Sequence, residues 1–263
     1  MNATTAVRKA AKAAVLPLGA FDGARPGDVV VLLYHRVGAG DREIDLAADV
    51  FDRQMARLAA SGDARTLDEV LSPEGPGGIV VSVDDGLSDF HRFVLPILQR
   101  HGVPAILYLA TGLVADGPGD AAPGPEALTW NELREAVETG LVTIGAHTHN
   151  HADLSAATAD EAREEMRRSK ELIEDRLGVA CRHFAYPWAV SSPAAERAAK
   201  ELFDSAALRW CTNRAGRLDP YRLGRTPVLR SDGSFFFRAK LTARLEKEAL
   251  IYRILRRGPW RKA

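Results

Sequence analysis

The sequence predicts an α/β protein with a parallel β-sheet, arranged either as an open doubly wound sheet or as a barrel. Short β-branched and aliphatic runs alternate along the chain with segments whose apolar residues have helical spacing. Polar residues that can carry chemistry follow the ends of several apolar runs. The length of 263 residues suits one large domain, because α/β barrels of roughly 200–250 residues fold as a single unit.

The first half of the chain holds three predicted strands and two predicted helices. The runs at residues 29–33, 79–83 and 105–110 are continuous and apolar, as in strands that are buried on both faces. Apolar residues recur at helical spacing over residues 49–60, and Asp49 is the expected N-cap. The second helix is expected over residues 88–100, where Pro96 predicts a kink.

The second half continues the alternation. We expect strands at residues 141–146, 183–186, 205–210 and 227–229, and helices over residues 129–138, 159–177 and 193–202. Thr129 and Glu132 form a predicted capping box, and Gly178 is the expected C-cap of the long charged helix. Residues 116–127 and 212–224 are predicted loops, and the tail from Phe235 onward is predicted to be helical and basic.

Composition and charge narrow the class of protein. Basic and acidic residues number 35 each, so the formal net charge is zero, which argues against a polybasic nucleic-acid binder. No apolar run is long enough for a transmembrane helix, and the N-terminal 25 residues make a poor signal peptide. Cys181 and Cys211 are expected to be buried thiols in a reducing compartment, with a single disulfide in an exported protein as the alternative.

Four polar groups stand at the carboxyl ends of predicted strands, where α/β proteins form their active sites. They are His35, the pair Asp84-Asp85, the cluster His147-Thr148-His149-Asn150-His151, and Tyr186-Pro187-Trp188. A carboxylate with two histidines is a ligand set of catalytic zinc or a related divalent ion. The spacing of His147 and His151 lets both rings reach one metal, whereas His149 is expected to point elsewhere.

Each group also has a simpler interpretation when taken alone. The Asp-Asp-Gly sequence is typical of a turn, and the histidine cluster could be a surface metal scavenger. His35 could be a buried structural histidine, and Tyr186-Pro187 could be turn chemistry. Their joint occurrence at strand ends is what favours an active site.

Three segments resemble motifs of the polysaccharide deacetylases, the family that shares the homology domain of the nodulation chitooligosaccharide deacetylase. Ser82-Val83-Asp84-Asp85-Gly86 resembles its T-F-D-D-G motif, and residues 147–151 match its H-[ST]-x-x-H motif. Residues 184–189 resemble its third motif in the form found in exopolysaccharide deacetylases. The resemblance covers roughly residues 28–230, and the first two motifs carry most of it.

The resemblance implies a distorted (β/α) barrel of about seven strands with a divalent metal, zinc above all, held by Asp85, His147 and His151. It implies Asp84 as the general base and the backbone N–H of Trp188 as an oxyanion donor. This agrees with simple chemistry, because a cation bound there polarises an acetamide carbonyl and acidifies bound water. The neighbouring Asp84 can then accept the proton.

The chain also departs from the family pattern. Ala185 occupies the position of the arginine that tethers the catalytic aspartate, so either Arg182 or Arg225 is expected to substitute for it. Ala189 replaces the usual glycine of the motif. No histidine follows His183, yet Leu33-Tyr34-His35 reproduces the family's L-x-H motif at the first strand, as in permuted exopolysaccharide deacetylases. We therefore expect His35 to protonate the leaving amine.

Tyr186 and Arg225 are expected to bind substrate. The predicted organisation is an N-terminal extension over residues 1–27, a deacetylase barrel over residues 28–232 and a basic amphipathic helix over residues 233–263. Residues 235–263 are expected either to pack on the barrel with a solvated basic face or to contact an anionic membrane surface. The expected location is the cytoplasm, including the inner face of the membrane.

The expected activity is metal-dependent removal of N-acetyl groups from amino sugars of a cell-surface polysaccharide or its lipid-linked precursor. The expected partner is therefore a glycan and not a nucleic acid. One alternative is hydrolysis of another amide, such as a formamido sugar, at the same site. Another is a catalytically inactive barrel that only binds glycan. The sequence does not indicate the sugar, the acyl group, the metal or the oligomeric state.

Overall fold

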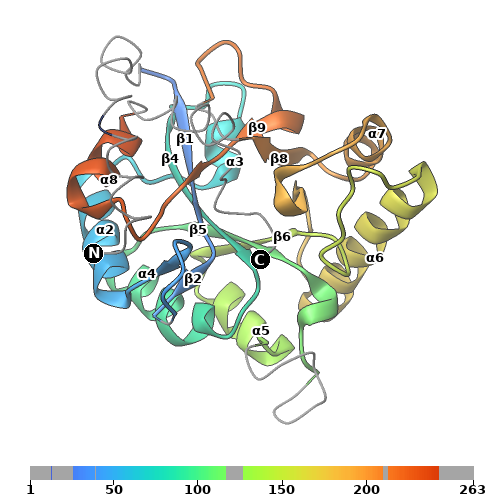
Figure 1. Cartoon of the computed structure of the whole chain (residues 1–263), viewed down its shortest axis with the longest axis horizontal. Coiled ribbons are helices and arrows are strands. Elements are labelled where there is room, and N and C mark those ends of the chain that lie inside the picture. The colour runs from blue at the N-terminus through green and yellow to red at the C-terminus, as the bar shows by residue number, and fades with distance from the viewer. Residues whose placement is uncertain (1–12, 14–25, 39, 117–126, 210–212, 243–263) are drawn as a thin grey trace.

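The fold is a nearly closed, distorted (β/α) barrel, seen in a computed structural model that describes residues 13, 26–38, 40–116, 127–209 and 213–242 (Figure 1). The main sheet has eight strands in the order β10-β1-β4-β5-β6-β7-β8-β9, and all neighbouring strands are parallel. The strands are β1 (Val29–Tyr34), β4 (Gly78–Asp85), β5 (Ala105–Leu109), β6 (Val142–Ala146), β7 (His183–Ala185), β8 (Ser205–Arg209), β9 (Leu223–Gly224) and β10 (Thr226–Pro227). A separate pair joins β2 (Arg36–Val37) to β3 (Asp45–Leu46).

One short segment joins the two edges of the sheet. β9 pairs with β8, β10 pairs with β1, and only Arg225 separates β9 from β10 in the chain. The segment 223–227 therefore takes one position in the barrel, with its first half bonded to one edge and its second half to the other. This confirms the predicted barrel over the open sheet, and it reconciles eight named strands with the expected seven positions.

Most helices lie around the outside of the sheet (Figure 1), and the short helix α3 closes one end of the barrel. The helices are α2 (Ala48–Ser61), α3 (Leu67–Leu71), α4 (Leu95–His101), α5 (Trp130–Glu138), α6 (Ala159–Leu177), α7 (Pro193–Leu202) and α8 (Gly233–Leu241). The main apolar core packs between these helices and the outward-facing strand residues. Because a helix of this kind buries an apolar face against the sheet, helical periodicity predicted the helices over residues 49–60, 129–138, 159–177 and 193–202 to within one residue at either end, whereas the short helix α3 was not predicted.

Helix ends test the sequence predictions most directly. The capping box of Thr129 and Glu132 is confirmed at α5, and α6 ends at Leu177 with Gly178 in the left-handed conformation. The expected N-cap Asp49 is wrong, because α2 begins at Ala48 after Ala47, which makes no side-chain capping bond. Asp49 instead lies in the first turn, where a carboxylate favours the helix dipole.

Other boundaries shift by a few residues. Pro96 lies in the first turn of α4, and a π-helical turn over Phe90–Val94 precedes it, so the expected helix is divided there. The last strand is Thr226–Pro227 and not 227–229. Cys181 is buried, whereas Cys211, most of the expected extension 1–27 and the tail beyond residue 242 lie outside the described residues. Among the helices that are described, none is long and apolar enough to cross a membrane.

Strand alternation decides which side chains enter the barrel. Val29 and Val31 belong to the inner cluster, so Leu33 and His35 continue on the same side, at the carboxyl end. Val80 is likewise an inner residue, which directs Asp84 inward. The opposite end of the barrel is filled by Leu67 and Val70 of α3, which share the inner cluster.

Candidate active site

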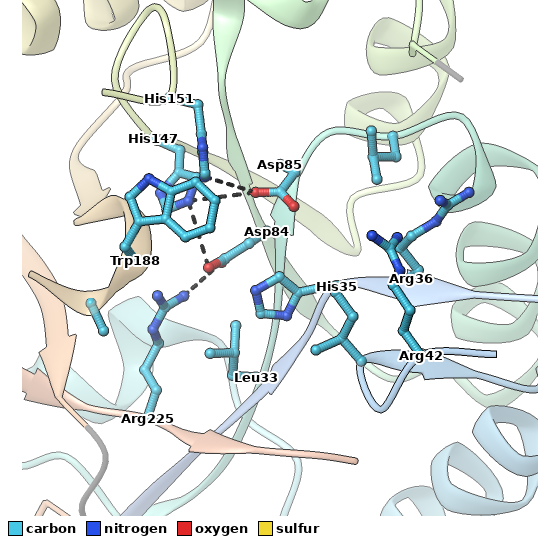
Figure 2. Close-up of a pocket in the computed structure, with 13 residues that line it drawn as sticks. Leu33, His35, Arg36, Arg42, Asp84, Asp85, His147, His151, Trp188 and Arg225 are labelled. Carbon is cyan, nitrogen blue, oxygen red and sulfur yellow. Dashed lines mark hydrogen bonds and ion pairs between the residues drawn. The ribbon is translucent and has the colours of Figure 1, made fainter. Parts of the chain in front are cut away.

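A pocket of about 380 Å³ opens at the carboxyl ends of the strands (Figure 2). Its walls come from β1, β4 and the segments that follow β6 and β7, together with Arg225 at the seam of the barrel. The four sequence groups expected at one edge of the sheet each contribute at least one residue to it. Convergence of segments so far apart in the chain follows from parallel strands sharing one carboxyl edge.

Asp84 and Asp85 both line the pocket, which a regular strand would not allow, because successive side chains point to opposite faces. The backbone resolves the conflict, since Asp85 has φ 78° and Gly86 has φ 82°. This left-handed turn ends β4 and redirects Asp85 toward the side that Asp84 already faces. Figure 2 shows the two carboxylates pointing into the same space.

Asp85, His147 and His151 form a group that could hold a metal ion, with one donor atom from each residue and all three atoms within 4.8 Å of one another. Nε2 of His151 lies 3.3 Å from Oδ1 of Asp85, and Nε2 of His147 lies 3.7 Å from the same oxygen. A carboxylate and two imidazoles are a donor set that suits zinc and related divalent ions.

A hydrogen bond on the side of the ring away from the carboxylates fixes the orientation of His147. Its Nδ1 lies 2.7 Å from the backbone carbonyl oxygen of Ala185, to which it donates a hydrogen bond. The other ring nitrogen, Nε2, is therefore the unprotonated one and faces the carboxylates, as metal-binding histidines require. Burial lowers the pKa of His147 to about 4, against the opposing influence of Asp84, so its imidazole is neutral at neutral pH.

The carboxylate of Asp85 is ionised for a different reason. Burial by itself would raise its pKa, but the hydrogen bond with His151 and the electrostatic influence of the neighbouring His35 and His147 rings hold the pKa well below its usual range. A neutral His147 next to an ionised Asp85 is the protonation pattern that metal binding needs.

Asp84 has a different partner. Nη1 of Arg225 donates a hydrogen bond of 2.6 Å to its Oδ1, and both side chains are 3% exposed. The second oxygen, Oδ2, lies 3.7 Å from Nε2 of His147. Arg225 therefore occupies the tethering role that Ala185 cannot fill. Arg182 does not, because its side chain is 53% exposed and pairs with Asp204 and Asp68.

His35 and Trp188 lie on either side of this cluster (Figure 2). His35 lines the pocket, and burial lowers its pKa while the charges of Asp85 and Asp84 oppose the shift. The Trp188 ring packs edge-on against His151, with 4.8 Å between ring centroids. Trp188 has φ 58°, so the turn after β7 brings this residue to the pocket wall.

Tyr186 is corrected from a substrate-binding residue to a core residue. Its side chain is 0% exposed and packs edge-on against Phe184, and it does not line the pocket. The alternation of β7 explains this, because Ala185 faces the inner cluster and its two neighbours face the outer core. His149 points elsewhere as expected, with Nδ1 2.9 Å from Oγ1 of Thr111.

The backbone is strained where the site is built. Within the described part of the chain, every non-glycine residue with positive φ lies in the three site segments: Asp85, Thr148, His151, Trp188 and Ala189. Such conformations cost about 1–3 kcal/mol each and persist where surrounding packing enforces them. This clustering marks the site independently of residue type.

Sequence reasoning missed two charged residues of the pocket wall, Arg36 and Arg42. Arg36 directly follows His35 in the chain, which is a signal that could have included it. Arg42 lies between β2 and β3 and belongs to no periodic pattern, so nothing in the sequence indicated it.

Comparison with known proteins places the site in a family. A family model described as polysaccharide deacetylase matches residues 72–203. The chain belongs to the polysaccharide deacetylase family. The matched range contains the three clustered metal-ligand candidates and Asp84, whereas His35 and Arg225 lie outside it.

Two curated relatives show what this family member resembles. YxkH of Bacillus subtilis (strain 168), assigned as a polysaccharide deacetylase, is 21% identical over 170 residues. The alignment covers 62% of this chain and 57% of YxkH, so the chain spans little more than half of that relative. The poly-β-1,6-N-acetyl-D-glucosamine N-deacetylase of Escherichia coli (strain K12) is 34% identical over 80 residues, which cover 27% of this chain and 12% of that protein.

Solved structures share the fold. The Streptococcus pyogenes deacetylase PplD in complex with acetate has a TM-score of 0.71 and 24% identity, over 82% of this chain and 99% of that one. IcaB from Ammonifex degensii has a TM-score of 0.66 and 22% identity, over 82% of this chain and 97% of that one. These likenesses confirm the barrel.

Proposed function

We propose that this family member is a metal-dependent hydrolase that removes N-acetyl groups from amino sugars of a cell-surface polysaccharide or its lipid-linked precursor. The observation that carries the proposal is the metal-ligand cluster lying beside a buried, arginine-held aspartate in one pocket. Family membership supports it, and so does the likeness to a relative named as a poly-N-acetylglucosamine N-deacetylase.

Asp85, His147 and His151 would hold the ion, and zinc fits this donor set best. When bound, a divalent ion supplies polarisation of the acyl carbonyl and a water of lowered pKa. Asp84 accepts the proton of the attacking water at Oδ2, because Arg225 holds its other oxygen. Water adds to the acyl carbon, the C–N bond breaks, and the products are acetate and the free amine of the sugar.

Two further groups complete the chemistry. His35 faces Asp84 across the pocket and gives a proton to the leaving nitrogen (Figure 2). Its lowered pKa makes the protonated ring a stronger acid for that transfer. The backbone N–H of Trp188, on the opposite wall, donates to the developing oxyanion.

Metal analysis joined to an amine-release assay on N-acetylglucosamine oligomers tests the proposal. We expect the wild-type protein to carry stoichiometric metal and to release amine, and chelation to abolish the release. Asp84→Asn should retain metal and lose at least about a hundredfold in kcat, because it removes the proton acceptor. His35→Ala should likewise retain metal and lose rate. A metal-loaded wild type that releases no amine, or an Asp84→Asn variant with full rate, would rule the proposal out.

The alternatives are separated by simple product assays. Measuring formate against acetate distinguishes hydrolysis of a formamido sugar from that of an N-acetyl sugar. Two departures from the family pattern favour the inactive glycan-binding barrel: the missing arginine at position 185 and the absent C-terminal histidine. The 2.6 Å contact of Arg225 with Asp84 supplies that arginine from elsewhere in the chain and weighs against inactivity. The cytoplasmic location and membrane contact through residues 235–263 stay predictions.

A further inference from the structure

We propose that Tyr108 is a positioning residue of the site: the face of its ring supports the guanidinium of Arg225, and that guanidinium holds Asp84 in the orientation that accepts the proton. This inference rests on the proposed function and deepens it, because it assigns a further residue to the same reaction. Tyr108 belongs to none of the three family motifs and does not line the pocket, so it acts only through Arg225.

The strand register places Tyr108 beside Asp84 on the inner face of the barrel. In the pairing of β4 with β5, Asp84 lies opposite Tyr108, and in the pairing of β5 with β6, Tyr108 lies opposite Gly145. Residues opposite each other on neighbouring strands share a face, and Tyr108 belongs to the inner cluster. The ring of Tyr108 and the carboxylate of Asp84 therefore start from one row of the sheet and enter the same interior.

A glycine makes room for the ring. A Cβ atom at Gly145 would lie 2.7 Å from Cδ1 and 2.8 Å from Cε1 of Tyr108. Carbon atoms that are not bonded prefer separations of about 3.5–4.0 Å, so a side chain at position 145 would displace the ring. Tyr108 is 0% exposed, and close packing on all sides confines its ring to this position.

The guanidinium of Arg225 lies over this ring. Its Cζ is 5.5 Å from the ring centroid, within the distance of about 6 Å at which a cation is attracted to an aromatic face. Both side chains are buried, and such contacts are stronger where water is excluded. Nη1 of the same guanidinium donates the hydrogen bond to Asp84 (Figure 2). Arg225 is therefore held by a ring face and by the proposed base together.

The ring of Tyr108 makes this contact, and its hydroxyl does not. Within the part of the chain that the structure describes, the hydroxyl has no hydrogen-bond partner. Burial raises the pKa of Tyr108 far above its ordinary value, although the charge of Arg225 opposes the shift. The phenol is therefore neutral, and the π-electron face attracts the guanidinium. A phenylalanine at this position should serve equally well.

Amine release from N-acetylglucosamine oligomers by the full-length, zinc-loaded protein tests this role. Tyr108→Leu should lower kcat about fivefold, as the loss of one buried cation–π contact predicts, and leave KM within about twofold. Tyr108→Phe should keep kcat within about twofold of the wild type, because the ring face remains.

Phe203→Leu is the matched control. Phe203 is also buried and has Nζ of Lys170 5.6 Å from its ring centroid, but it belongs to the outer core, away from the pocket. This variant should lose stability and keep kcat. An equal fall in kcat in both leucine variants would reject the positioning role, because any loss of a buried ring would then have the same effect.

Fluorinated rings separate the charge distribution of the aromatic face from its packing. In the Tyr108→Phe protein, the phenylalanine is replaced in turn by its mono-, di- and trifluorinated analogues. Fluorine withdraws electrons from the ring face and changes the ring volume little, so the cation–π contact weakens stepwise. We expect kcat to fall with each fluorine while zinc affinity stays within about twofold. A kcat that does not depend on fluorination would overturn the inference, including in the case where Tyr108→Leu does not fold.

A double-mutant cycle in urea unfolding tests the contact without an activity assay. The combination of Tyr108→Leu with Arg225→Gln should destabilise by less than the sum of the two single losses, because both remove the same contact. Additive losses would reject the contact. Coupled losses in a wild-type protein that releases no amine would reject the deacylase and retain Tyr108 as the support of Arg225. Amine release with full kcat in a folded Tyr108→Leu protein would reject the positioning role and retain the deacylase.

Discussion

The contact between Arg225 and Asp84 joins residues 141 positions apart in the chain. Both side chains are buried, so their charges depend on each other, because a buried ion left alone is far costlier than a buried pair. The arginine lies at the seam of the barrel, between the two strands that bond to opposite sheet edges. Closing the barrel and orienting the proposed base are thus functions of one segment.

Arg225→Gln should destabilise the protein by about 3–5 kcal/mol, because it leaves Asp84 buried without its counter-charge. We expect kcat for amine release to fall at least tenfold while zinc affinity changes little, since Arg225 contacts none of the metal-ligand candidates. Arg225→Lys should recover part of the rate. Urea unfolding, zinc titration and the amine-release assay measure the three quantities. Unchanged kcat in a folded Arg225→Gln protein would contradict the positioning role.

How much of the site the sequence could predict depends on how each residue is placed. The metal-ligand candidates and Asp84 lie at the ends of strands with a strong apolar pattern, so their convergence followed from parallel topology. Arg225 could only be named as one of two candidates, because its contact is made by barrel closure. Tyr186 was misplaced because its neighbours in the motif are site residues, whereas strand alternation turns its ring into the core.

At the scale of secondary-structure elements, the site depends on left-handed turns that directly follow the strands. The segment Pro187–Ala189 after β7 contains two consecutive left-handed residues, Trp188 with φ 58° and Ala189 with φ 53°. No pattern of apolar residues encodes such a turn, and alanine at the second position is unfavourable for it. Capping boxes are the opposite case, since that of Thr129 and Glu132 was predicted from the two residue types alone.

Ala189→Gly should raise stability by about 0.5–1 kcal/mol. Relief of the left-handed conformation is worth about 1–2 kcal/mol, and the greater freedom of glycine in the unfolded chain offsets about half of it. Ala56→Gly, at an exposed position inside α2, is the control and should destabilise by about 1 kcal/mol. The urea midpoint of each variant, compared with that of the wild-type protein, shows whether the substitution raises or lowers stability. A loss of stability in Ala189→Gly would show that the turn is not strained at this residue.

At the scale of the whole molecule, one end of the barrel forms the pocket and the other end contributes to packing. The carboxyl end holds the pocket, and the other end is closed by α3, which is tied to the sheet through Asp68. Oδ1 of Asp68 lies 3.3 Å from Nε2 of His183, and Nδ1 of that histidine lies 2.9 Å from Oγ of Ser205. Because Ser205 is 0% exposed, this serine, histidine and aspartate serve packing and not nucleophilic catalysis.

The buried imidazole of His183 makes stability depend on pH. Burial lowers its pKa below the value of about 6.5 expected in the unfolded chain, although Asp68 opposes the shift. The unfolded chain therefore binds more protons than the folded protein as pH falls below about 6.5. The stabilisation is fully present above that pH and is lost toward the lower folded pKa, so the protein should be less stable at pH 5 than at pH 7.

Urea unfolding at pH 7, 6 and 5 measures this dependence, and His183→Gln should flatten it by removing the titrating group. Amine release by His183→Gln at pH 7 should match that of the wild type, because the residue lies at the end of β7 away from the pocket. If the unfolding free energy of His183→Gln depends on pH as steeply as that of the wild type, this end of the barrel does not determine stability in acid.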